Sequence, residues 1–319
     1  MTRTEYDVVA LGELLIDFTE AGLGENGRRL FEQNPGGAPA NLLTLAARLG
    51  FHTAFAGKVG RDMHGIYLKS VLEHEGIDTR GLILSDEAFT TLAFVALSEA
   101  GERTFSFARK PGADTLLRKD ELPLGLLRDT RILHFGSLSL TDEPARSATL
   151  FAVETAKRSG ALISYDPNYR APLWKSRSEA VDRMRSVLPL VDILKLSEDE
   201  AVLLSGKACP EDAAHALSHI GIPCIAVTLG AQGALVCIHG EIRHISAPPV
   251  SVTDTTGAGD AFFGGFLCRL LQLGHDMQDL RPDDGVSAAR WGCAAAACCI
   301  QKRGGIPAMP TLSMLKRYL

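Results

Sequence analysis

The sequence predicts an α/β fold of three layers, in which a mostly parallel central sheet is flanked by helices and carries a small additional β lid. Two observations predict the layers. First, short apolar runs typical of buried strands alternate with segments that have apolar residues at helical spacing. Second, this alternation extends from residue 132 almost to the end of the 319-residue chain. A third observation predicts the lid, because two stretches nearer the N-terminus interrupt the alternation.

The first elements follow from apolar spacing. Residues 8–11 form a short buried-strand run that ends at Gly12. Apolar residues at positions 42, 45, 46 and 49 have helical spacing, and Gly50 suits the C-terminal end of that helix. The next two assignments are a strand over residues 54–59 and a helix over residues 67–74.

The lid is assigned to residues 13–33 and 90–110. The first stretch is rich in glycine and glutamate and has no helical stripe. The second contains two β segments, 92–97 and 104–108, separated by a hairpin-like break at Ala100-Gly101. We therefore expect a single domain over residues 1–319, with the lid inserted in it.

The strand–helix order returns from residue 132 and continues to the end. It predicts strands over residues 133–135, 162–165, 193–196, 225–228 and 234–238, and helices over residues 144–160, 179–188, 210–220, 260–274 and 284–302. No internal repeat and no low-complexity linker interrupts these elements, which favours one core domain.

The composition excludes some classes of function. Hydrophobic residues make up 46% of the chain and charged residues 22%, the balance of an ordinary globular protein. The formal net charge of −5 at pH 7 argues against a general binder of nucleic acids or anionic membranes, because both usually need a basic excess. We expect neither as a partner.

The cysteines and the N-terminus predict a soluble cytoplasmic protein. Seven cysteines is an odd number, Cys298 and Cys299 are adjacent, and no pair has C-x-x-C spacing, so we expect reduced thiols. The first residues resemble neither a signal peptide nor a spanning helix. The apolar run 293–300 is shorter than the roughly 20 residues needed to cross a bilayer.

The most informative motif is Asp254-Thr255-Thr256-Gly257-Ala258-Gly259-Asp260-Ala261-Phe262. Its two glycines lie where a loop becomes a helix, and a helix N-terminus attracts phosphate through unpaired N–H groups and the helix dipole. Asp260 would repel such an anion, which suggests that it takes a proton from an attacking hydroxyl instead. The alternative is a glycine-rich turn in which Asp260 only complements the dipole, as short glycine motifs often do.

Residues 254–262 resemble the C-terminal signature of the ribokinase/PfkB family of carbohydrate kinases. Residues 36–50, with Gly36-Gly37, Asn41 and Gly50, resemble its N-terminal signature, and the strand–helix order between them is similar to the family fold. The resemblance covers nearly the whole chain. It implies a ribokinase-like fold and a kinase that moves the γ-phosphoryl group of ATP to a sugar hydroxyl, with Mg²⁺ and K⁺ as cofactors.

The resemblance assigns roles around the C-terminal signature. Asp260 corresponds to the catalytic base, and the N–H groups of Gly257, Ala258 and Gly259 correspond to an anion hole that stabilises charge on the phosphoryl group. Asp254 and Thr256 correspond to residues that bind a potassium ion together with backbone carbonyls near the C-terminus. The residues by themselves give no reason to expect that ion.

Sugar binding is expected near the end of the first strand and the start of the first helix. Gly36-Gly37 allows the backbone to approach a ligand, and Asn41 offers both a donor and an acceptor. Asp17 lies just past the first strand, where α/β folds place ligands, although alone it could equally be a solvated loop acid. The resemblance assigns Asp17, Gly36, Gly37 and Asn41 to the sugar.

A polar run, Asp166-Pro167-Asn168-Tyr169-Arg170, directly follows the strand predicted over residues 162–165. The carboxyl end of a strand belongs to the ligand crevice of an α/β fold. The pattern resembles fructokinases and 2-keto-3-deoxygluconate kinases of the family, in which the arginine reaches the sugar, so Arg170 is assigned to the sugar. Outside that context, Asn168 and Arg170 would more often be turn and surface residues.

Another polar run, residues 195–200, follows the next strand. Many family members have Asn-x-x-Glu here and hold magnesium largely through water; Ser197 replaces the asparagine, as in fructokinase-like members. Glu200 is assigned to Mg²⁺, which binds few carboxylates and keeps several waters. Ser197 and Glu200 also fit a helix capping box, and both interpretations can hold together.

The nucleotide is assigned to Lys195, Thr228, Gly230 and Gly233. The run from Thr228 to Gly233 resembles the nucleotide loop of the family, although the bare sequence equally fits a hairpin turn. The alanine-rich segment 294–299, followed by Gly304-Gly305, is expected to wall the adenine site. Its small residues would equally suit close helix packing.

The lid carries two aromatic residues, Phe105 and Phe107, that alternate with polar neighbours and therefore face the same way. We expect them to close over the sugar and exclude water. Alternating aromatics also mark buried sheet faces, so stacking between two lids is the alternative. A lid with an apolar face needs a cover, and we predict a homodimer formed through it.

The lid pattern, Asp-Pro-Asn-x-Arg and Lys-Leu-Ser-Glu resemble fructokinases most, which implies phosphorylation of D-fructose at its 6-hydroxyl. 2-Keto-3-deoxygluconate kinase ranks second, because Arg170 could pair with a sugar-acid carboxylate, and ribokinase ranks third because of Ser197.

A dinucleotide-dependent oxidoreductase is rejected, because no G-x-G-x-x-G follows the first strand. An inactive sugar-binding regulatory protein should have lost Asp260 or the glycines beside it, and all are present.

Overall fold

The computed structural model describes the backbone of residues 4–97 and 103–319 and the side chains of residues 4–95 and 106–319. Its main sheet has nine strands in the order β13-β12-β11-β10-β9-β8-β1-β4-β5, parallel from β11 to β5 and antiparallel at β12 and β13. The strands are β1 (Tyr6–Leu11), β4 (Thr53–Gly60), β5 (Asp78–Ser85), β8 (Thr130–Gly136), β9 (Leu162–Asp166), β10 (Ile193–Ser197), β11 (Cys224–Thr228), β12 (Ala234–Ile238) and β13 (Glu241–Ile245).

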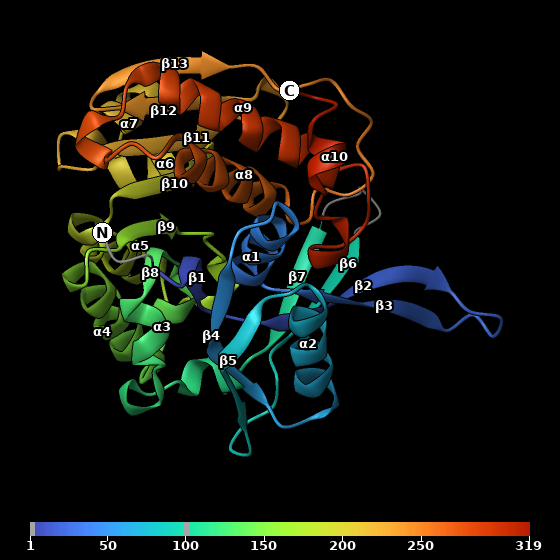
Figure 1. The fold of residues 1–319 in the computed structure, drawn as a ribbon. Coiled ribbons are helices and arrows are strands. Elements are labelled where there is room, and N and C mark those ends of the chain that lie inside the picture. The colour runs from blue at the N-terminus through green and yellow to red at the C-terminus, as the bar shows by residue number, and fades with distance from the viewer. Residues whose placement is uncertain (1–3, 98–102) are drawn as a thin grey trace.

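Helices cover both faces of this sheet, and two separate cores result. In β1, Val9 and Leu11 belong to the core shared with α3 to α7, whereas Val8 and Ala10 belong to the core shared with α1, α2, α8 and α9. Figure 1 shows α3 and α4 on one side of β1 and β8, and α1 and α2 on the other. Burial on both faces explains why the central strands are continuous apolar runs rather than alternating ones.

The helices have the following bounds: α1 (Ala38–Arg48), α2 (Met63–His74), α3 (Leu124–Arg128), α4 (Ala145–Arg158), α5 (Arg177–Ser186), α6 (Glu198–Ser205), α7 (Pro210–Ser218), α8 (Ala258–Leu273), α9 (Pro282–Cys299) and α10 (Leu312–Leu315). The predicted fold class is confirmed. Helix α2 begins four residues before the predicted start, because Asp62 caps it by accepting the N–H groups of His64 and Gly65.

A second, four-stranded sheet has the order β3-β2-β6-β7. Its strands are β2 (Leu15–Leu23), β3 (Arg29–Gly36), β6 (Leu92–Leu97) and β7 (Arg103–Ala108). Figure 1 shows β2 and β3 leaving the body of the molecule as a long hairpin. We call these four strands the lid.

Two edge strands, β5 and β13, were not predicted. Both lie at the ends of the main sheet, where one side of the strand is more open to solvent, and their sequences, Asp78–Ser85 and Glu241–Ile245, mix polar with apolar residues. Without a continuous apolar run, such strands resemble loops in the sequence. The strands over 92–97 and 234–238 were predicted with the bounds observed.

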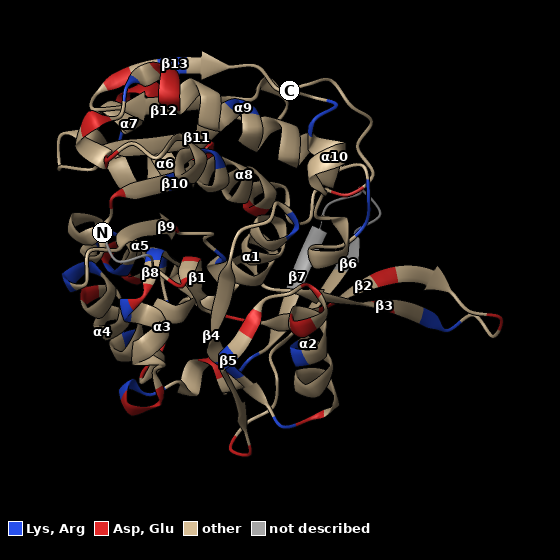
Figure 2. Ribbon diagram, viewed as in Figure 1, with Lys and Arg blue, Asp and Glu red and all other residues tan. Residues whose placement is uncertain are grey.

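Among the described residues, charges of both signs lie on the outer elements and the thiols are unpaired. In the view of Figure 2, acidic and basic segments alternate over the outer helices and loops. All seven cysteines are free, and six of them are buried. Among the described residues, no helix is long and apolar enough to cross a membrane.

Candidate active site

A cavity of about 460 Å³ opens between the lid and the main body. Four kinds of element contribute to it: the carboxyl ends of β9, β10 and β11, the loop after β1, the N-terminal ends of α1 and α8, and the lid strands. This is where an α/β fold of parallel strands is expected to bind ligands. The predicted site residues that line it are Asp17, Gly37, Asn41, Phe107, Arg170, Lys195, Glu200, Thr228, Thr256, Gly257, Ala258, Gly259 and Asp260.

Asp260 lies in the first turn of α8 and is only 9% exposed. The side-chain amide of Asn41, in α1, donates a hydrogen bond to Oδ2 of Asp260 over 2.7 Å. Burial raises the pKa of Asp260 to about 6; the bond from Asn41 and the charge of Lys195 oppose this rise, whereas Asp166 adds to it. The carboxylate is therefore largely ionised at pH 7 and can accept a proton.

The turn before α8 presents backbone amides to the cavity. Gly257 has φ of +77°, a left-handed conformation that suits glycine, and an added Cβ would lie 2.9 Å from Cε of Met309. The N–H of Ala258 donates to the carbonyl of Thr255 over 3.2 Å. The following amides belong to the first helical turn, where no intrahelical acceptor exists, so they can face an anion.

Lys195 stands beside this turn. Its Nζ forms an ion pair with Oδ2 of Asp166 at 2.8 Å, and both residues are buried. A Cβ added to Gly259 would lie 2.9 Å from the same Nζ, so the ammonium group is close to the helix start. Burial acts to lower the pKa of Lys195, but the charges of Asp166 and Glu200 outweigh it and raise that pKa. The cavity thus holds a positive charge beside the start of α8.

Glu200 forms the capping box expected at the start of α6. One carboxylate oxygen accepts the N–H of Ser197 at 2.8 Å, and the other accepts the N–H of Tyr169 at 2.7 Å. Glu200 is buried and lines the cavity. Since both oxygens are already bonded to backbone amides, this side chain ties the loop after β9 to the end of β10.

Asp17, on β2, also lines the cavity. Gly36 makes room for it, because a Cβ at that position would lie 2.4 Å from Oδ2 of Asp17. Burial raises the pKa of Asp17 to about 7; Arg170 lowers it, and Asp260 raises it. Gly36 itself is not among the lining residues, whereas Gly37 is. Gly36 thus leaves room for the carboxylate of Asp17 and does not itself face the cavity.

Arg170 and Asn168 follow β9 and both line the cavity. Asn168 has φ of +45°, and its N–H donates to Oδ1 of Asp166 over 3.1 Å. The guanidinium of Arg170 acts electrostatically on both Asp17 and Asp260. The polar run after β9 therefore enters the crevice, rather than forming a surface turn.

Glu13 is a lining residue that sequence reasoning missed. It is 4% exposed, and its Oε1 accepts the N–H of Ala38, the first residue of α1, at 3.0 Å. Burial raises the pKa of Glu13 to about 7, against the opposing effects of the Ala38 amide and the Arg109 charge. Its position directly after Gly12, at the carboxyl end of β1, was the available signal.

Some predicted residues lie away from the cavity or outside the described side chains. Gly230 and Gly233 belong to a hairpin turn between β11 and β12, and only Thr228 of that run lines the cavity. The side chain of Phe105 is outside the described set, whereas Phe107 is a lining residue. Ala294 and Cys299 of α9 are buried in a core shared with α8, which agrees with close helix packing.

Asp254 organises the loop that precedes α8. Its Oδ1 accepts the N–H and the hydroxyl of Thr256 at 2.9 and 2.8 Å, and its Oδ2 accepts the N–H of Gly304 at 3.0 Å. The carbonyl of Ile300 lies beside this loop and accepts the N–H of Asp254. Carboxylate, hydroxyl and carbonyl oxygens together form a donor set suited to a hard cation.

Comparison with known proteins gives consistent results. The sequence profile described as pfkB family carbohydrate kinase matches residues 6–312. The chain is 42% identical to Probable fructokinase-2 of Arabidopsis thaliana, covering 97% of this chain and 95% of that protein, and 42% identical to Fructokinase-1 of Oryza sativa subsp. japonica, covering 95% and 94%.

Solved structures agree in fold. A fructokinase with bound ATP from Xylella fastidiosa superposes with a TM-score of 0.91 at 33% identity, covering 98% of each chain. A fructokinase double mutant from Vibrio cholerae O395, in a form with fructose, ADP and potassium ion bound, superposes with a TM-score of 0.88 at 32% identity, covering 100% of each chain.

Proposed function

This chain belongs to the pfkB family of carbohydrate kinases and is an ATP-dependent sugar kinase; from that premise we propose that it is a fructokinase. The reaction would convert D-fructose and ATP to fructose 6-phosphate and ADP. The fructokinase relatives support the sugar, and the buried Asp260, which lines the cavity beside the first amides of α8, supports the chemistry.

In the proposed reaction, Asp260 removes the proton of the sugar 6-hydroxyl while its oxygen attacks the γ-phosphorus of ATP. The bond between the γ-phosphorus and the β-γ bridging oxygen breaks, and ADP leaves with that oxygen. A base with a pKa of about 6 suits this step, because it is ionised at neutral pH yet basic enough to share a proton. The bond from Asn41 orients one carboxylate oxygen and leaves the other for the hydroxyl.

The phosphate end of the cavity favours negative charge. The amides of Gly257 and Gly259, together with that of Ala258, which is shared with the carbonyl of Thr255, would act on the phosphoryl oxygens. The dipole of the 16-residue helix α8 would act in the same direction. Lys195 would add a positive charge held in place by Asp166. These groups are fixed before substrate binds, which is the arrangement that lowers a reaction barrier most effectively.

The sugar end favours a neutral sugar over a sugar acid. Asp17 and Glu13 both face the cavity, and Asp17 partly compensates the charge of Arg170. A carboxylate on the substrate would meet two further acids there, whereas hydroxyls can donate to them. This observation favours D-fructose over 2-keto-3-deoxygluconate.

Mg²⁺ and K⁺ are proposed as cofactors on different grounds. Among the described residues no group of three or more His, Cys, Asp or Glu could hold a metal ion directly, and both oxygens of Glu200 are bonded to amides. Mg²⁺ would therefore be held by the nucleotide phosphates, with Glu200 reached through water. Asp254 and Thr256 would hold K⁺, which supplies positive charge near the helix start.

A homodimer through the lid is proposed from the exposed apolar residues of the projecting hairpin. Leu23 is 67% exposed, Leu30 is 49% exposed and Phe31 is 41% exposed. A hairpin that carries such residues away from the body of the molecule would be stabilised by pairing with a second copy (Figure 1). Sedimentation of the wild-type protein and of Leu30→Glu at equal concentration would test this.

The experiment for the reaction is ATP consumption with Mg²⁺ and K⁺ across fructose, 2-keto-3-deoxygluconate and ribose, with a control lacking sugar. Fructose-dependent turnover far above the other sugars is the expected result. Turnover restricted to the sugar acid would assign Arg170 to its carboxylate and reject fructose. No sugar-dependent turnover would favour the inactive sugar-binding protein.

A further inference from the structure

The hairpin formed by β6 and β7 is attached to the body of the protein at two points. Thr91 directly precedes β6, and Arg109 directly follows β7. Both side chains bond to the same residue, Asp114. The hydroxyl of Thr91 donates to Oδ1 of Asp114 over 2.5 Å, and Nε of Arg109 donates to Oδ2 over 2.8 Å. One carboxylate therefore joins the two ends of the hairpin.

This junction is buried, and its charged groups are paired. Thr91 is 1% exposed, Arg109 6% and Asp114 7%. An ion pair at 2.7 Å also joins Nη2 of Arg109 to Asp114. In a site with so little water, a charged pair and its hydrogen bonds hold a fixed geometry, and removal of one partner leaves the other without compensation.

The junction also reaches the wall of the cavity. Arg109 donates from Nη1 to the hydroxyl of Thr141 over 2.9 Å and from Nη2 to the carbonyl of Leu138 over 2.8 Å. Leu138 lines the cavity, and the charge of Arg109 acts on Glu13, which lines it as well. The same guanidinium therefore contacts the lid attachment and the wall that faces the sugar.

The residues held by this junction are those with which β6 and β7 face the cavity. Val95 lies four residues after Thr91 in β6, and Phe107 lies two residues before Arg109 in β7. In antiparallel strands, side chains so close to the fixed ends can shift little unless the ends themselves shift. Asp114 therefore holds the strand ends from which Val95 and Phe107 reach the cavity.

We propose that Asp114 is a positioning residue for sugar binding, which fixes both ends of the β6–β7 hairpin so that Val95 and Phe107 cover the sugar and exclude water. The inference rests on the proposed sugar-kinase function of the same cavity. Asp114 touches neither substrate nor nucleotide in this arrangement; it acts through the hairpin. A loosened cover should weaken sugar binding and allow water to replace the sugar hydroxyl as acceptor of the phosphoryl group.

Two variants disrupt the junction to different extents. Thr91→Val keeps the side-chain shape and the Arg109–Asp114 pair, but removes the hydrogen bond to one end of the hairpin. Asp114→Asn removes the charge that compensates Arg109. We expect the KM for fructose to rise about tenfold in Thr91→Val and about 10²-fold in Asp114→Asn, because small displacements of positioning groups have effects of that size. The KM for ATP should change less than twofold.

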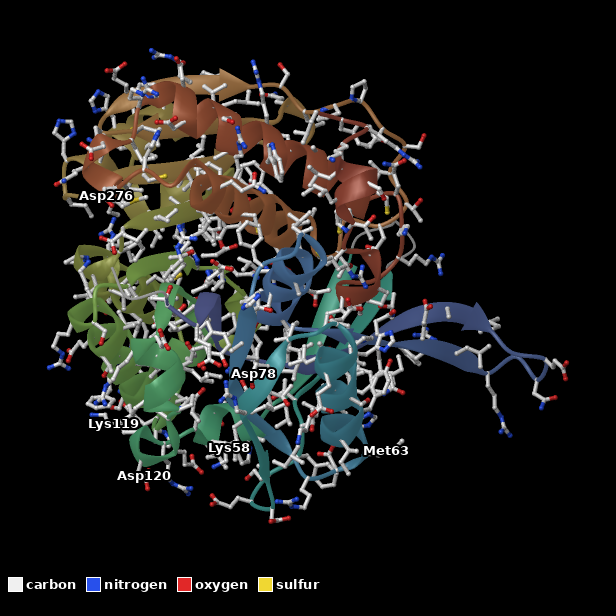
Figure 3. The ribbon with its side chains drawn as sticks, in the orientation of Figure 1. Lys58, Met63, Asp78, Lys119, Asp120 and Asp276 are labelled. Atoms are coloured by element: carbon white, nitrogen blue, oxygen red, sulfur yellow. The ribbon has the colours of Figure 1, made fainter. Side chains whose placement is uncertain are left out.

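The matched control is a neighbouring ion pair that does not join the two ends of the hairpin. Lys58 is 2% exposed on its side chain and pairs with Glu121 at 2.7 Å; Figure 3 shows Lys58 in the same lower part of the molecule as Lys119 and Asp120. In Glu121→Gln the second bond of Lys58, to the carbonyl of Leu116, is kept. This variant should keep the wild-type KM for both substrates.

Two further readouts separate positioning from simple loss of stability. ADP formed per fructose phosphate should rise above one in both variants, because water gains access, and should stay at one in Glu121→Gln. Hydrogen exchange of the β6 and β7 amides should accelerate while that of β1 and β8 does not. If Thr91→Val is folded and retains the wild-type fructose KM, coupling ratio and exchange rates, the proposal is wrong.

The same experiment distinguishes this inference from the proposed function. A wild-type protein without sugar-dependent turnover would reject the kinase assignment, and hydrogen exchange would still decide whether Asp114 anchors the hairpin. If Asp114→Asn does not fold, Thr91→Val alone decides. An equal rise in the KM for ATP and for fructose would also overturn the inference, because the hairpin would then not act on the sugar end specifically.

Discussion

The floor of the cavity and the lid differ in how their charged side chains are held. In the floor, which comprises residues 257–260 with Lys195 and Asp166, the ion pair between Lys195 and Asp166 measures 2.8 Å and its side chains are 7% and 3% exposed. In the lid, the pair between Arg29 and Glu20 measures 3.8 Å and its side chains are 68% and 22% exposed. The charged pair of the floor is buried and close, whereas that of the lid hairpin is wider and mostly exposed.

We relate this difference to two functions, the chemistry on the phosphoryl group in the floor and the covering of the sugar by the lid. Chemistry on a phosphoryl group requires charges fixed in advance, and buried, fully bonded groups meet that requirement. A cover over a sugar must admit and release it, so its strands can be exposed and adjustable as long as their attachment is firm. We therefore expect changes in the floor to affect turnover and stability strongly, and changes in the lid to affect sugar affinity more modestly.

The largest effect is expected from Asp260→Asn. Asparagine has the same shape but cannot accept the proton of the attacking hydroxyl, so turnover should fall by a factor on the order of 10² or more while sugar binding is kept. Single-turnover kinetics and calorimetry with fructose would measure the two quantities. Asp276→Asn, which changes an exposed acid at the edge of the molecule (Figure 3), is the control and should behave as wild type.

Near-normal turnover of Asp260→Asn would remove this residue as the base. It would also weaken the contrast between floor and lid, because a buried acid at the start of α8 would then have no chemical role. A parallel loss of sugar binding would instead indicate that the substitution disturbs the bond from Asn41 and the start of α8.

The next effect is on stability and compares the two ion pairs directly. Lys195→Met leaves Asp166 buried without its partner, and breaking a buried pair in this way costs about 3–5 kcal/mol of unfolding free energy. Arg29→Met in the lid should cost less than about 1 kcal/mol, because an exposed pair contributes little. Denaturant unfolding of both variants and wild type gives the comparison. Equal losses would show that the lid pair is as important as the floor pair.

One acid of the floor and one acid of the lid should together determine how activity depends on pH. Asp260 must be ionised to act, and its pKa is raised to about 6, while Asp17 on β2 has a pKa raised to about 7. The value of kcat/KM for fructose should therefore rise with pH and level off above about 7, falling about tenfold per unit between about 7 and 6 and up to about a hundredfold per unit below about 6, where both carboxyls are protonated. A flat profile from pH 5 to 8 would contradict it.

Stability should change in the opposite direction. A carboxyl whose pKa is raised in the folded state contributes most below its unfolded pKa of about 4 and loses that contribution as pH rises through its folded pKa. Unfolding free energy should thus decrease between about pH 4 and pH 7 where Asp260 and Asp17 dominate. Asp17→Asn should move the activity profile toward pH 6 and leave the contribution of Asp260 alone.

The sequence predicted the floor better than the lid, for a physical reason. The residues from Gly257 to Asp260 are contiguous, so a single motif predicted both the helix start and the acid in its first turn. The bond between Asn41 and Asp260 joins residues 219 positions apart, and no local pattern reports it. Asn41 was assigned to the sugar alone, and its contact with the acid emerges only from the fold.

The same explanation applies to the residues that the sequence did not predict. Glu13 and Asp114 have no distinctive neighbours in the sequence; their importance comes from what surrounds them in space, namely Ala38 for the first and Thr91 with Arg109 for the second. The layers of the fold were predictable because burial on both faces gives strands a long apolar run. Edge strands and long-range polar bonds leave no such pattern.

The smallest expected effect comes from comparing one phenylalanine on each face of the lid. Phe107 lines the cavity, whereas Phe94 lies 37% exposed and stacks on Phe18 at 5.3 Å between ring centroids. Phe107→Ala should raise the KM for fructose about three- to tenfold, because part of the apolar cover is lost, with kcat nearly unchanged. Phe94→Ala, its control, should leave the KM for fructose as it is and lower only the stability of the lid.

If both phenylalanine variants raise the KM equally, the lid acts as one flexible unit and the face turned to the cavity has no special part in sugar binding. If only Phe107→Ala does so while its kcat stays near wild type, the lid contributes affinity and the floor contributes chemistry. A fall in kcat with Phe107→Ala would instead mean that the cover also aligns the hydroxyl with Asp260, so that the two regions share one task.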